Sequence, residues 1–391
     1  MDFIKSFFGL MDSLTWGWAL IPILVIFGVF ITIMSGFVQF SFFGRMFRVL
    51  TGKDDLNDPN SISAREALLV SVGGRVGGGN IAGVAVAISV GGPGAVFWMW
   101  LIALVGMATS LIECTLAQVY KRPDGDGTFR GGPAEYIRRG LGERYNWLAI
   151  VYGICLLAAF GLGFNAFQGN TMAGAVQESL GMDRTITGVI VTIITGLVIF
   201  GGIRRIAKAA DVVVPVMAIL YLGAALLVIV VNITELPRVL SDIVSSAFGY
   251  NEAIAGGMGA AIAQGLRRGL FSNEAGMGSA PNIAAVATPA PHHPSSQGFV
   301  QALGVFIDTI LICTATAVMI LLSGVMTPGS TLTGTPLTQA AMTAGSASLA
   351  KHRDGTAIDA GGLDMWKRMA ALLNERGAAL KPYGIDMGYH N

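Results

Sequence analysis

The chain has 391 residues, of which 53% are apolar and only 13% charged, and its mean hydropathy is +0.64. This composition indicates a membrane protein with several spans and excludes a highly charged soluble or disordered chain. The formal net charge of +1 gives no sign of the basic surface that binds nucleic acid. Cys114, Cys155 and Cys313 lie far apart in apolar stretches, so we expect buried thiols and neither disulfides nor a metal site.

Eight apolar stretches have roughly the length needed to cross a bilayer core, which takes about 20 helical residues. They cover residues 17–40, 62–92, 94–119, 146–178, 186–203, 206–231, 253–290 and 297–325. The fifth is short, and the fourth and seventh are long enough to tilt or break. We therefore predict an all-α polytopic membrane protein with about eight membrane helices.

Basic residues are unevenly divided between alternate connections. One set carries Arg45, Arg48, Lys53, Lys121, Arg122, Arg130, Arg138, Arg139, Arg144, Arg204, Arg205 and Lys208. The other set carries Lys5, Arg184 and Arg238. Because cytoplasmic connections are enriched in lysine and arginine, the first set is predicted to face the cytoplasm, with the N-terminus outside a cell membrane.

The stretch 71–94, SVGGRVGGGNIAGVAVAISVGGPG, carries glycines at 73, 74, 77, 78 and 79 inside an apolar span. So many glycines at one level remove helix propensity, and bare backbone is tolerated in a membrane only around protein or a polar cavity. We therefore predict a break between two half-helices, roughly 62–75 and 80–92. The alternative is close packing on a neighbouring helix, but packing motifs space their small residues along one face.

The seventh stretch repeats this pattern. Residues 253–268 are helical in pattern, whereas 269–281 (GLFSNEAGMGSAP) are not expected to continue as a regular apolar helix. Two interrupted spans are typical of internally repeated transporters. By the charge alternation, the second and seventh spans cross in opposite directions, so the repeats are predicted to be inverted.

The pattern of spans ends near residue 325. Residues 326–344 are predicted to form an exterior loop, and 345–391 form a polar tail of different character, without a membrane span.

Three stretches resemble the alanine-or-glycine:cation symporter family, whose members are often described as sodium:alanine symporters. They are RVGGGNIAGVAVAISVGGPGAVFWMW (75–100), GLRRGLFSNEAGMGSAP (265–281) and QALGVFIDTILICTATAVMILLSG (301–324). The resemblance implies one extra N-terminal helix followed by two inverted five-helix repeats. Here these would be 17–40, 62–231 and an incomplete second repeat, 253–325, within a transporter domain of residues 1–344. The family's C-terminal helices are not recognisable in the chain.

The resemblance also assigns roles to residues. Carbonyls of Gly73, Arg75 and Val76 would face a cation, and amides of Gly77, Gly78 and Gly79 would hold the substrate carboxylate at a helix N-terminus. Phe271 would wall the pocket, and Ser272 and Asn273 would bind the substrate amino group or a cation. Gln168 resembles a polar pocket residue of the family; an interhelical hydrogen bond is the alternative. Asn80 would coordinate a cation or cap the second half-helix.

Ionisable residues within spans are costly and usually functional. Asp308 is predicted to be a cation ligand or the partner of Arg267 or Arg268. Glu113 and Glu274 are open to either structural pairing or ion coupling. Arg75 needs an acidic or carbonyl partner, for which Glu274 is the candidate.

The sequence contains no phosphate loop, dinucleotide fingerprint, hydrolase elbow or zinc-protease motif, so we predict a transporter and no enzyme or cofactor. The expected function is symport of a small neutral amino acid, alanine or glycine, with a cation, sodium, by alternating access. The alternatives are a transport-incompetent member of the family and a membrane sensor that binds the amino acid. The oligomeric state is left open.

Overall fold

The computed structural model describes residues 2–52, 62–124, 128–249, 257–326 and 332–354. Helices make up nearly all of this part, and its two short strands, β1 (Arg122–Pro123) and β2 (Phe129–Arg130), pair antiparallel. The predicted all-α fold is therefore confirmed.

Several helices contain π-helical or 3₁₀ turns, labelled η. The first half of the chain contains α1 (Asp2–Ser13), η1 (Leu14–Leu20), α2 (Ile21–Met34), α3 (Val38–Ser41), α4 (Phe43–Leu50), α5 (Ala64–Arg75), η2 (Gly79–Gly83), α6 (Val84–Gly91), α7 (Gly94–Val119), α8 (Pro133–Tyr136), η3 (Ile137–Leu141), η4 (Glu143–Tyr145), α9 (Asn146–Leu156), η5 (Leu157–Gly163) and α10 (Phe164–Leu180). The second half contains α11 (Arg184–Ile199), α12 (Gly202–Val231), η6 (Ile233–Glu235), α13 (Leu236–Ala247), α14 (Gly257–Asn273), α15 (Ser279–Val286), α16 (Pro294–Val305), η7 (Phe306–Cys313), α17 (Thr314–Leu322) and α18 (Gly334–Asp354).

Five continuous helices in the described residues are long and apolar enough to cross a membrane: Gly9–Met34, Gly94–Val119, Glu143–Leu180, Gly202–Val231 and Pro294–Leu322. A sixth candidate is the broken pair Ala64–Arg75 and Gly79–Gly91, whose halves meet at 51°. These six correspond to six of the eight predicted spans. The predicted span 186–203 is the shorter helix α11, and 253–290 is divided between α14 and α15, with residues 253–256 outside the described part.

The prediction of a loop is wrong for residues 334–344; of the rest of the predicted loop, 327–331 lie outside the described residues. Residues from Gly334 to Asp354 form α18, which packs against α12 and α17 and against η2. The polar residues of this segment made a helix hard to predict, because the helix is stabilised by packing and not by a continuous apolar face. The predicted polar tail thus begins inside α18, and its remainder, 355–391, lies outside the described residues.

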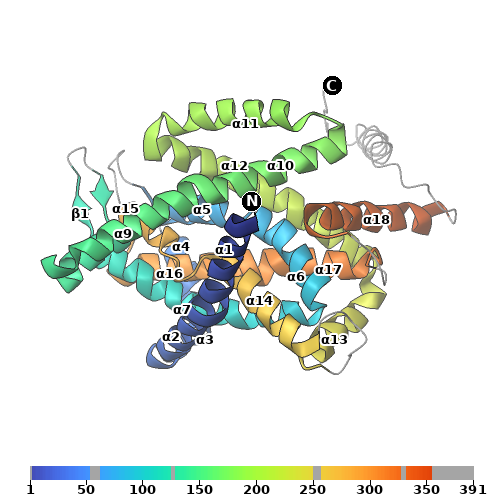
Figure 1. Cartoon of the computed structure of the whole chain (residues 1–391), viewed down its shortest axis with the longest axis horizontal. Coiled ribbons are helices and arrows are strands. Elements are labelled where there is room, and N and C mark those ends of the chain that lie inside the picture. The colour runs from blue at the N-terminus through green and yellow to red at the C-terminus, as the bar shows by residue number, and fades with distance from the viewer. Residues whose placement is uncertain (1, 53–61, 125–127, 250–256, 327–331, 355–391) are drawn as a thin grey trace.

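The most deeply buried spans lie in the middle of the molecule. In the most apolar window, 61% of α7 and 67% of the α16–α17 span are buried, compared with 6% for the α9–α10 span and 17% for α12. Figure 1 shows α10, α11 and α12 along one long edge, away from α7 and α16. Exposed apolar side chains on these outer helices are the surface expected to meet lipid.

Glycines allow α14 and α16 to approach α7 closely. A Cβ atom on Gly265 would lie 2.4 Å from the carbonyl oxygen of Ala95, and one on Gly298 would lie 2.6 Å from that of Leu111. Such approach of helix backbones is the usual source of helix association in membranes, where no hydrophobic effect operates between helices. Both helices therefore pack against α7. Helix α14 leads into the second break, and α16 leads into η7.

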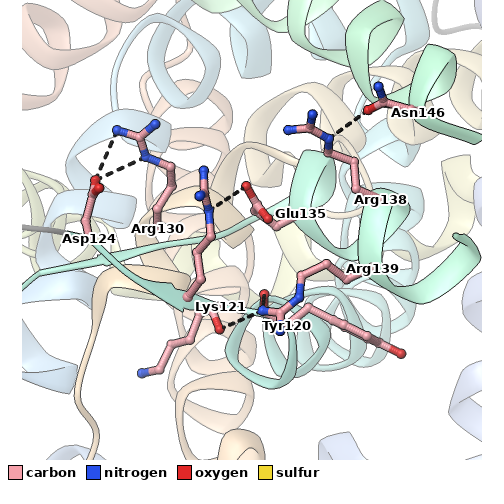
Figure 2. Close-up of polar contacts among 9 residues, drawn as sticks. Tyr120, Lys121, Asp124, Arg130, Glu135, Arg138, Arg139 and Asn146 are labelled. Carbon is pink, nitrogen blue, oxygen red and sulfur yellow. Dashed lines mark hydrogen bonds and ion pairs between the residues drawn. The ribbon is translucent and has the colours of Figure 1, made fainter. Parts of the chain in front are cut away.

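The basic loop 120–145 is folded where it is described (Figure 2). Arg130 pairs with Asp124 and Arg122 with Glu135, while Arg139 donates hydrogen bonds to the carbonyls of Tyr120 and Lys121. These contacts attach the loop to the end of α7.

Candidate functional site

The first break lies where the glycine cluster predicts it. Helix α5 begins after Ser63, which forms a capping box with Glu66, and ends at Arg75. Val76 is extended, with φ −74° and ψ 113°, and the chain becomes helical again at Gly79. The predicted pair of half-helices is confirmed.

The amides in this break have side-chain partners. The Gly77 amide donates to Asn80 Oδ1 at 3.0 Å, and the Gly78 amide donates to Gln168 Oε1 at 2.8 Å. Gln168, on α10, thus forms an interhelical hydrogen bond, which was the alternative to a pocket role for this residue. Its amide oxygen meets an amide at the N-terminal end of the second half-helix.

The second break also exists, but it begins later than predicted. Helix α14 continues to Asn273, so Ser272 and Asn273 belong to its last turn and not to the interrupted stretch. Glu274 then takes a left-handed conformation with φ +54°, followed by Gly276 and Gly278 at +82° and +81°. Three left-handed residues within five positions stop the helix, and α15 starts at Ser279.

A buried polar cluster links η2, the last turn of α14 and η7. We call its residues, Asn80, Ser272, Asp308, Thr309 and Cys313, the Asp308 cluster. Asn80 Nδ2 donates to Asp308 Oδ1 at 2.7 Å and to Ser272 Oγ at 3.0 Å. Ser272 Oγ and Thr309 Oγ1 both donate to Asp308 Oδ2 at 2.8 Å. Every side chain of the cluster is at most 2% exposed. The cluster brings together residues from the first break, α14 and η7, which lie more than 190 positions apart in the chain at the extremes.

Two alternatives for these residues are excluded. Asn80 does not cap the second half-helix, because its oxygen binds the preceding Gly77 amide and its nitrogen points into the cluster. Among the described residues Asp308 forms an ion pair with neither Arg267, which instead binds Asp12, nor Arg268; its oxygens accept bonds from Asn80, Ser272 and Thr309.

Sequence reasoning missed Thr309 and Cys313 as members of the cluster. Cys313, predicted only to be buried, lies with its sulfur 3.3 Å from Asn80 Nδ2 and 3.2 Å from Ser272 Oγ. The π-helical turn of η7 contains both Asp308 and Cys313. Such turns often mark functional sites, but an α-helical reading of the sequence does not reveal them.

An aromatic group covers the first break. Phe271 stacks on Phe164 at 5.0 Å between ring centroids and meets the edge of Phe167 at 5.6 Å. A Cβ atom on Gly79 would lie 3.7 Å from the ring of Phe271, and one on Gly78 would lie 2.5 Å from Phe167. Phe271 thus lies beside the first break, and its role as a wall of a substrate pocket stays a prediction. Phe164 and Phe167 were not anticipated because they belong to an apolar span.

The remaining predicted residues lie at the edge of this arrangement. Gly73 faces Val214, and Val76 packs against the apolar cluster around Val72. Asn273 is fully buried and lies beside Gly106 of α7, its oxygen accepting the Ala275 amide, so its side chain does not join the Asp308 cluster.

Arg75 does not form the predicted pair with Glu274. The Glu274 carboxylate accepts a hydrogen bond from Ser279, and no guanidinium nitrogen of Arg75 has a hydrogen-bond partner among the described residues.

Helix α18 covers the break from the other side. Thr338 Oγ1 donates to the carbonyl of Ile81 in η2 at 2.9 Å, and Gln339 reaches the carbonyl of Ala175 on α10. Because residues 326–344 were predicted to form a loop, Thr338 was not among the predicted site residues.

The predicted cytoplasmic ends of α5, α7 and α15 are tied together. The Thr288 amide donates to the carbonyl of Ile62, and Gln118 and Lys121 donate to the carbonyl of Ala287 at the end of α15. Partial burial lowers the pKa of Lys121 from its ordinary value to about 8. The bonds to Ala287 satisfy a carbonyl that the C-terminus of α15 leaves open.

The chain resembles known transporters over most of its length. A model of the sodium:alanine symporter family matches residues 1–353. The amino-acid carrier protein AlsT of Bacillus subtilis is 47% identical over 341 residues, covering 87% of this chain and 71% of that protein. The probable sodium/glutamine symporter GlnT of the same organism is 47% identical over 340 residues, covering 87% and 70%. The sodium/alanine symporter AgcS of Methanococcus maripaludis is 39% identical over 352 residues, covering 88% and 76%.

These proteins are transporters and not enzymes, which agrees with the expectation from the sequence. The match over most of the chain, together with the two broken helices, shows that this chain belongs to the sodium:alanine symporter family.

Proposed function

We propose that the chain is a secondary active symporter that moves a small neutral amino acid, alanine or glycine, together with sodium by alternating access. The observation that carries the proposal is the Asp308 cluster, in which Asn80 of the first broken helix meets Ser272, in the last turn of α14 directly before the second break. A site shared by two broken helices changes shape when either half-helix moves, which is what coupled transport needs.

The Asp308 cluster has the chemistry of a cation site. Sodium is a hard ion that prefers oxygen ligands, and the cluster offers a carboxylate together with the oxygens of Ser272 and Thr309. The C-terminal end of α5 adds backbone carbonyls near Gly73, Arg75 and Val76, at the negative end of a helix dipole. We assign cation binding to these carbonyls, Asp308 and Asn80.

The amides of Gly77, Gly78 and Gly79 suit the substrate carboxylate. Gln168 Oε1 accepts the Gly78 hydrogen bond here, so a substrate carboxylate would replace one neutral acceptor by a charged one. Phe271, Ser272 and Asn273 would complete the substrate site. Phe164, Phe167 and Phe271, which lie close to Gly78 and Gly79, would limit the size of the substrate side chain, and this favours alanine or glycine over glutamine.

We further propose that α5–α6 and α14–α15 begin two repeats of inverted topology within a transporter domain of residues 1–344. In this arrangement 17–40 is the extra helix, 62–231 the first repeat and 253–325 part of the second. The N-terminus would lie outside the cell membrane, as the distribution of basic loops favours.

The test is uptake of labelled alanine into proteoliposomes with an inward sodium gradient, compared with an equal potassium gradient. Sodium-driven uptake that unlabelled glycine or alanine inhibits, and that Asp308→Asn removes, supports the proposal. Sodium-stimulated alanine binding without uptake would instead identify an amino-acid sensor. Absence of both would identify a transport-incompetent member of the family.

A further inference from the structure

Two adjacent arginines on α14 have different surroundings. Arg267 forms an ion pair with Asp12 of α1 and lies over the ring of Trp16, 5.3 Å from its centroid. Arg268 is partly buried and forms no ion pair with any described acid, and its Nε atom is buried without a hydrogen-bond acceptor among the described residues. A guanidinium taken out of water needs acceptors, so Arg268 has capacity left to bind an anion.

Arg268 lies one helical turn from the Asp308 cluster. Residues four apart share one face of a helix, so Arg268 is on the same side of α14 as Ser272, which belongs to that cluster. Both residues meet the first broken helix at glycines. A Cβ atom on Gly79 would lie 3.5 Å from Ser272 Cα, and one on Gly83 would lie 4.0 Å from Arg268 Cδ. Arg268 therefore lies against the end of η2, one turn beyond the proposed substrate and cation sites.

A third polar residue, Gln264, extends this row by another turn. A Cβ atom on Gly91, the last residue of α6, would lie 3.0 Å from Gln264 Cβ, and Gln264 Oε1 is buried without a hydrogen-bond partner among the described residues. Figure 1 shows α6 beside α14, the helices between which the row lies. Ser272 is 1% exposed, whereas Arg268 and Gln264 are partly exposed. The row therefore leads from the surface of the protein to the buried Asp308 cluster.

We propose that Arg268 receives the carboxylate of the amino-acid substrate on its way to the amides of Gly77, Gly78 and Gly79. A guanidinium presents its N–H groups in a fork that matches the two oxygens of a carboxylate. Because the row ends at Ser272, a residue of the proposed substrate site, the substrate carboxylate is the anion that suits it. This inference rests on the proposed symport function and names a residue that selects its substrate. By the predicted orientation, the start of α14 lies on the exterior side of the break.

The test compares Arg268→Gln and Arg268→Lys with the wild type in sodium-driven alanine uptake. We expect Arg268→Gln to raise the KM for alanine by about tenfold with little change in the maximal rate, because a charged partner of the carboxylate is lost. Arg268→Lys keeps the charge and should recover part of this loss. A wild-type KM in Arg268→Gln overturns the proposal.

A substrate analogue separates carboxylate recognition from a structural role. Alaninamide has the shape of alanine but lacks the carboxylate, and both compounds are measured as inhibitors of labelled alanine uptake. We expect the wild type to prefer alanine and Arg268→Gln to lower the ratio of the two inhibition constants by about tenfold. A purely structural role changes the amount of active protein but not this ratio, so an unchanged ratio overturns the proposal.

Arg267→Gln is the matched control. It removes the same charge from the neighbouring position of α14, but Arg267 binds Asp12 and does not belong to the row. The KM for alanine and the inhibition ratio are therefore expected to stay as in the wild type. Equal changes in Arg267→Gln and Arg268→Gln would show a general effect of charge and overturn the assignment.

A second measurement uses the wild-type protein and needs no transport. Phenylglyoxal, which modifies arginine, is applied to the purified protein, and tandem mass spectrometry follows its addition to Arg268. We expect alanine with sodium to slow this reaction several-fold and alaninamide to leave it unchanged; equal protection by both, protection by neither, or no reaction at Arg268 overturns the proposal. Failure of sodium-driven uptake by the wild type would contradict the proposed function, while this labelling would still decide the role of Arg268.

Discussion

At the scale of single residues, the site depends on which backbone amides have no partner within a helix and on which side chains accept their hydrogen bonds. The Gly78 amide is bound to Gln168, and this contact is possible because neither Gly77 nor Gly78 carries a side chain. The glycine cluster therefore does more than interrupt a helix. It also allows the side chain of Gln168 on α10 to reach the Gly78 amide.

The substitution Gly77→Ala tests this contact. Its Cβ atom would lie 2.5 Å from Gln168 Nε2 and 2.7 Å from Oε1, so the flexible amide must move away from Gly78. Loss of one hydrogen bond of about 1 kcal/mol and misplacement of the pocket residue should raise the KM for alanine by about three- to tenfold. Uptake kinetics in proteoliposomes give the measurement.

Gly74→Ala is the control, because a Cβ atom there meets nothing within 4 Å and alanine favours the helix of α5. If both variants change KM equally, the effect comes from the backbone and the role of Gln168 is wrong.

At the scale of elements, the breaks could be predicted from the sequence but their partners could not. Five glycines in the stretch 73–79 predict the first break, because close helix packing would space small residues along one face and would not gather them at one depth in the membrane. The second break was placed too early, since a helix ending in Ser272 and Asn273 is held by packing on α7 and not by propensity. Helix α18 was missed for the same reason.

Thr338→Val tests whether α18 supports the first break. Thr338 is 2% exposed, and its hydroxyl donates a hydrogen bond from α18 to the Ile81 carbonyl of η2. Valine keeps the shape but leaves that carbonyl without this donor, at a cost of about 1 kcal/mol. We expect the half-saturating sodium concentration to rise by about three- to tenfold.

Thr192→Val provides the comparison, because Thr192 is exposed on α11 and binds only the carbonyl of Gly188 on its own helix. An unchanged sodium dependence in Thr338→Val would show that α18 does not act on the break.

Lys121 gives the tie between α7 and α15 a pH dependence. Its pKa is lowered to about 8 in the folded protein, from the 10.5 of a free lysine. Between these values the unfolded chain holds more protons than the folded one, so the free energy of unfolding rises with pH; below about 8 both states are protonated and the dependence vanishes. We expect the Tm in detergent to show this rise above pH 8, and Lys121→Met to reduce it.

The same substitution at the exposed Lys208 of α12 is the control for a general loss of charge. An identical pH profile for wild type and Lys121→Met would contradict the assignment.

At the scale of the whole molecule, hydropathy identifies the spans but does not show which of them are buried inside the protein and which face its surface. The Gly94–Val119 and Glu143–Leu180 spans have the same mean hydropathy, 2.1, yet 61% of the first and 6% of the second is buried. The difference lies in small residues that permit close contact, such as Gly265 and Gly298 on the neighbours of α7, and these matter only once the neighbours are known. Asp308 could likewise be predicted as functional because a carboxylate in a span is costly, whereas its partners Asn80 and Ser272 required the fold.

The distribution of basic residues among the loops predicts the orientation of the chain in the membrane. Figure 1 shows β1 and the start of α9 at one end of the molecule and α13 at the other, so Arg130 of β2 and Arg238 of α13 mark opposite ends. Both side chains are 60% exposed, which makes them matched positions for a cysteine probe. We expect a membrane-impermeant thiol reagent to label Arg238→Cys but not Arg130→Cys in intact cells, and both after permeabilisation, because the basic loop belongs in the cytoplasm. Both variants are made with Cys155→Ser, since Cys155 is the exposed cysteine of the described part. Labelling of Arg130→Cys alone in intact cells would place the N-terminus inside and reverse the direction assigned to both broken helices.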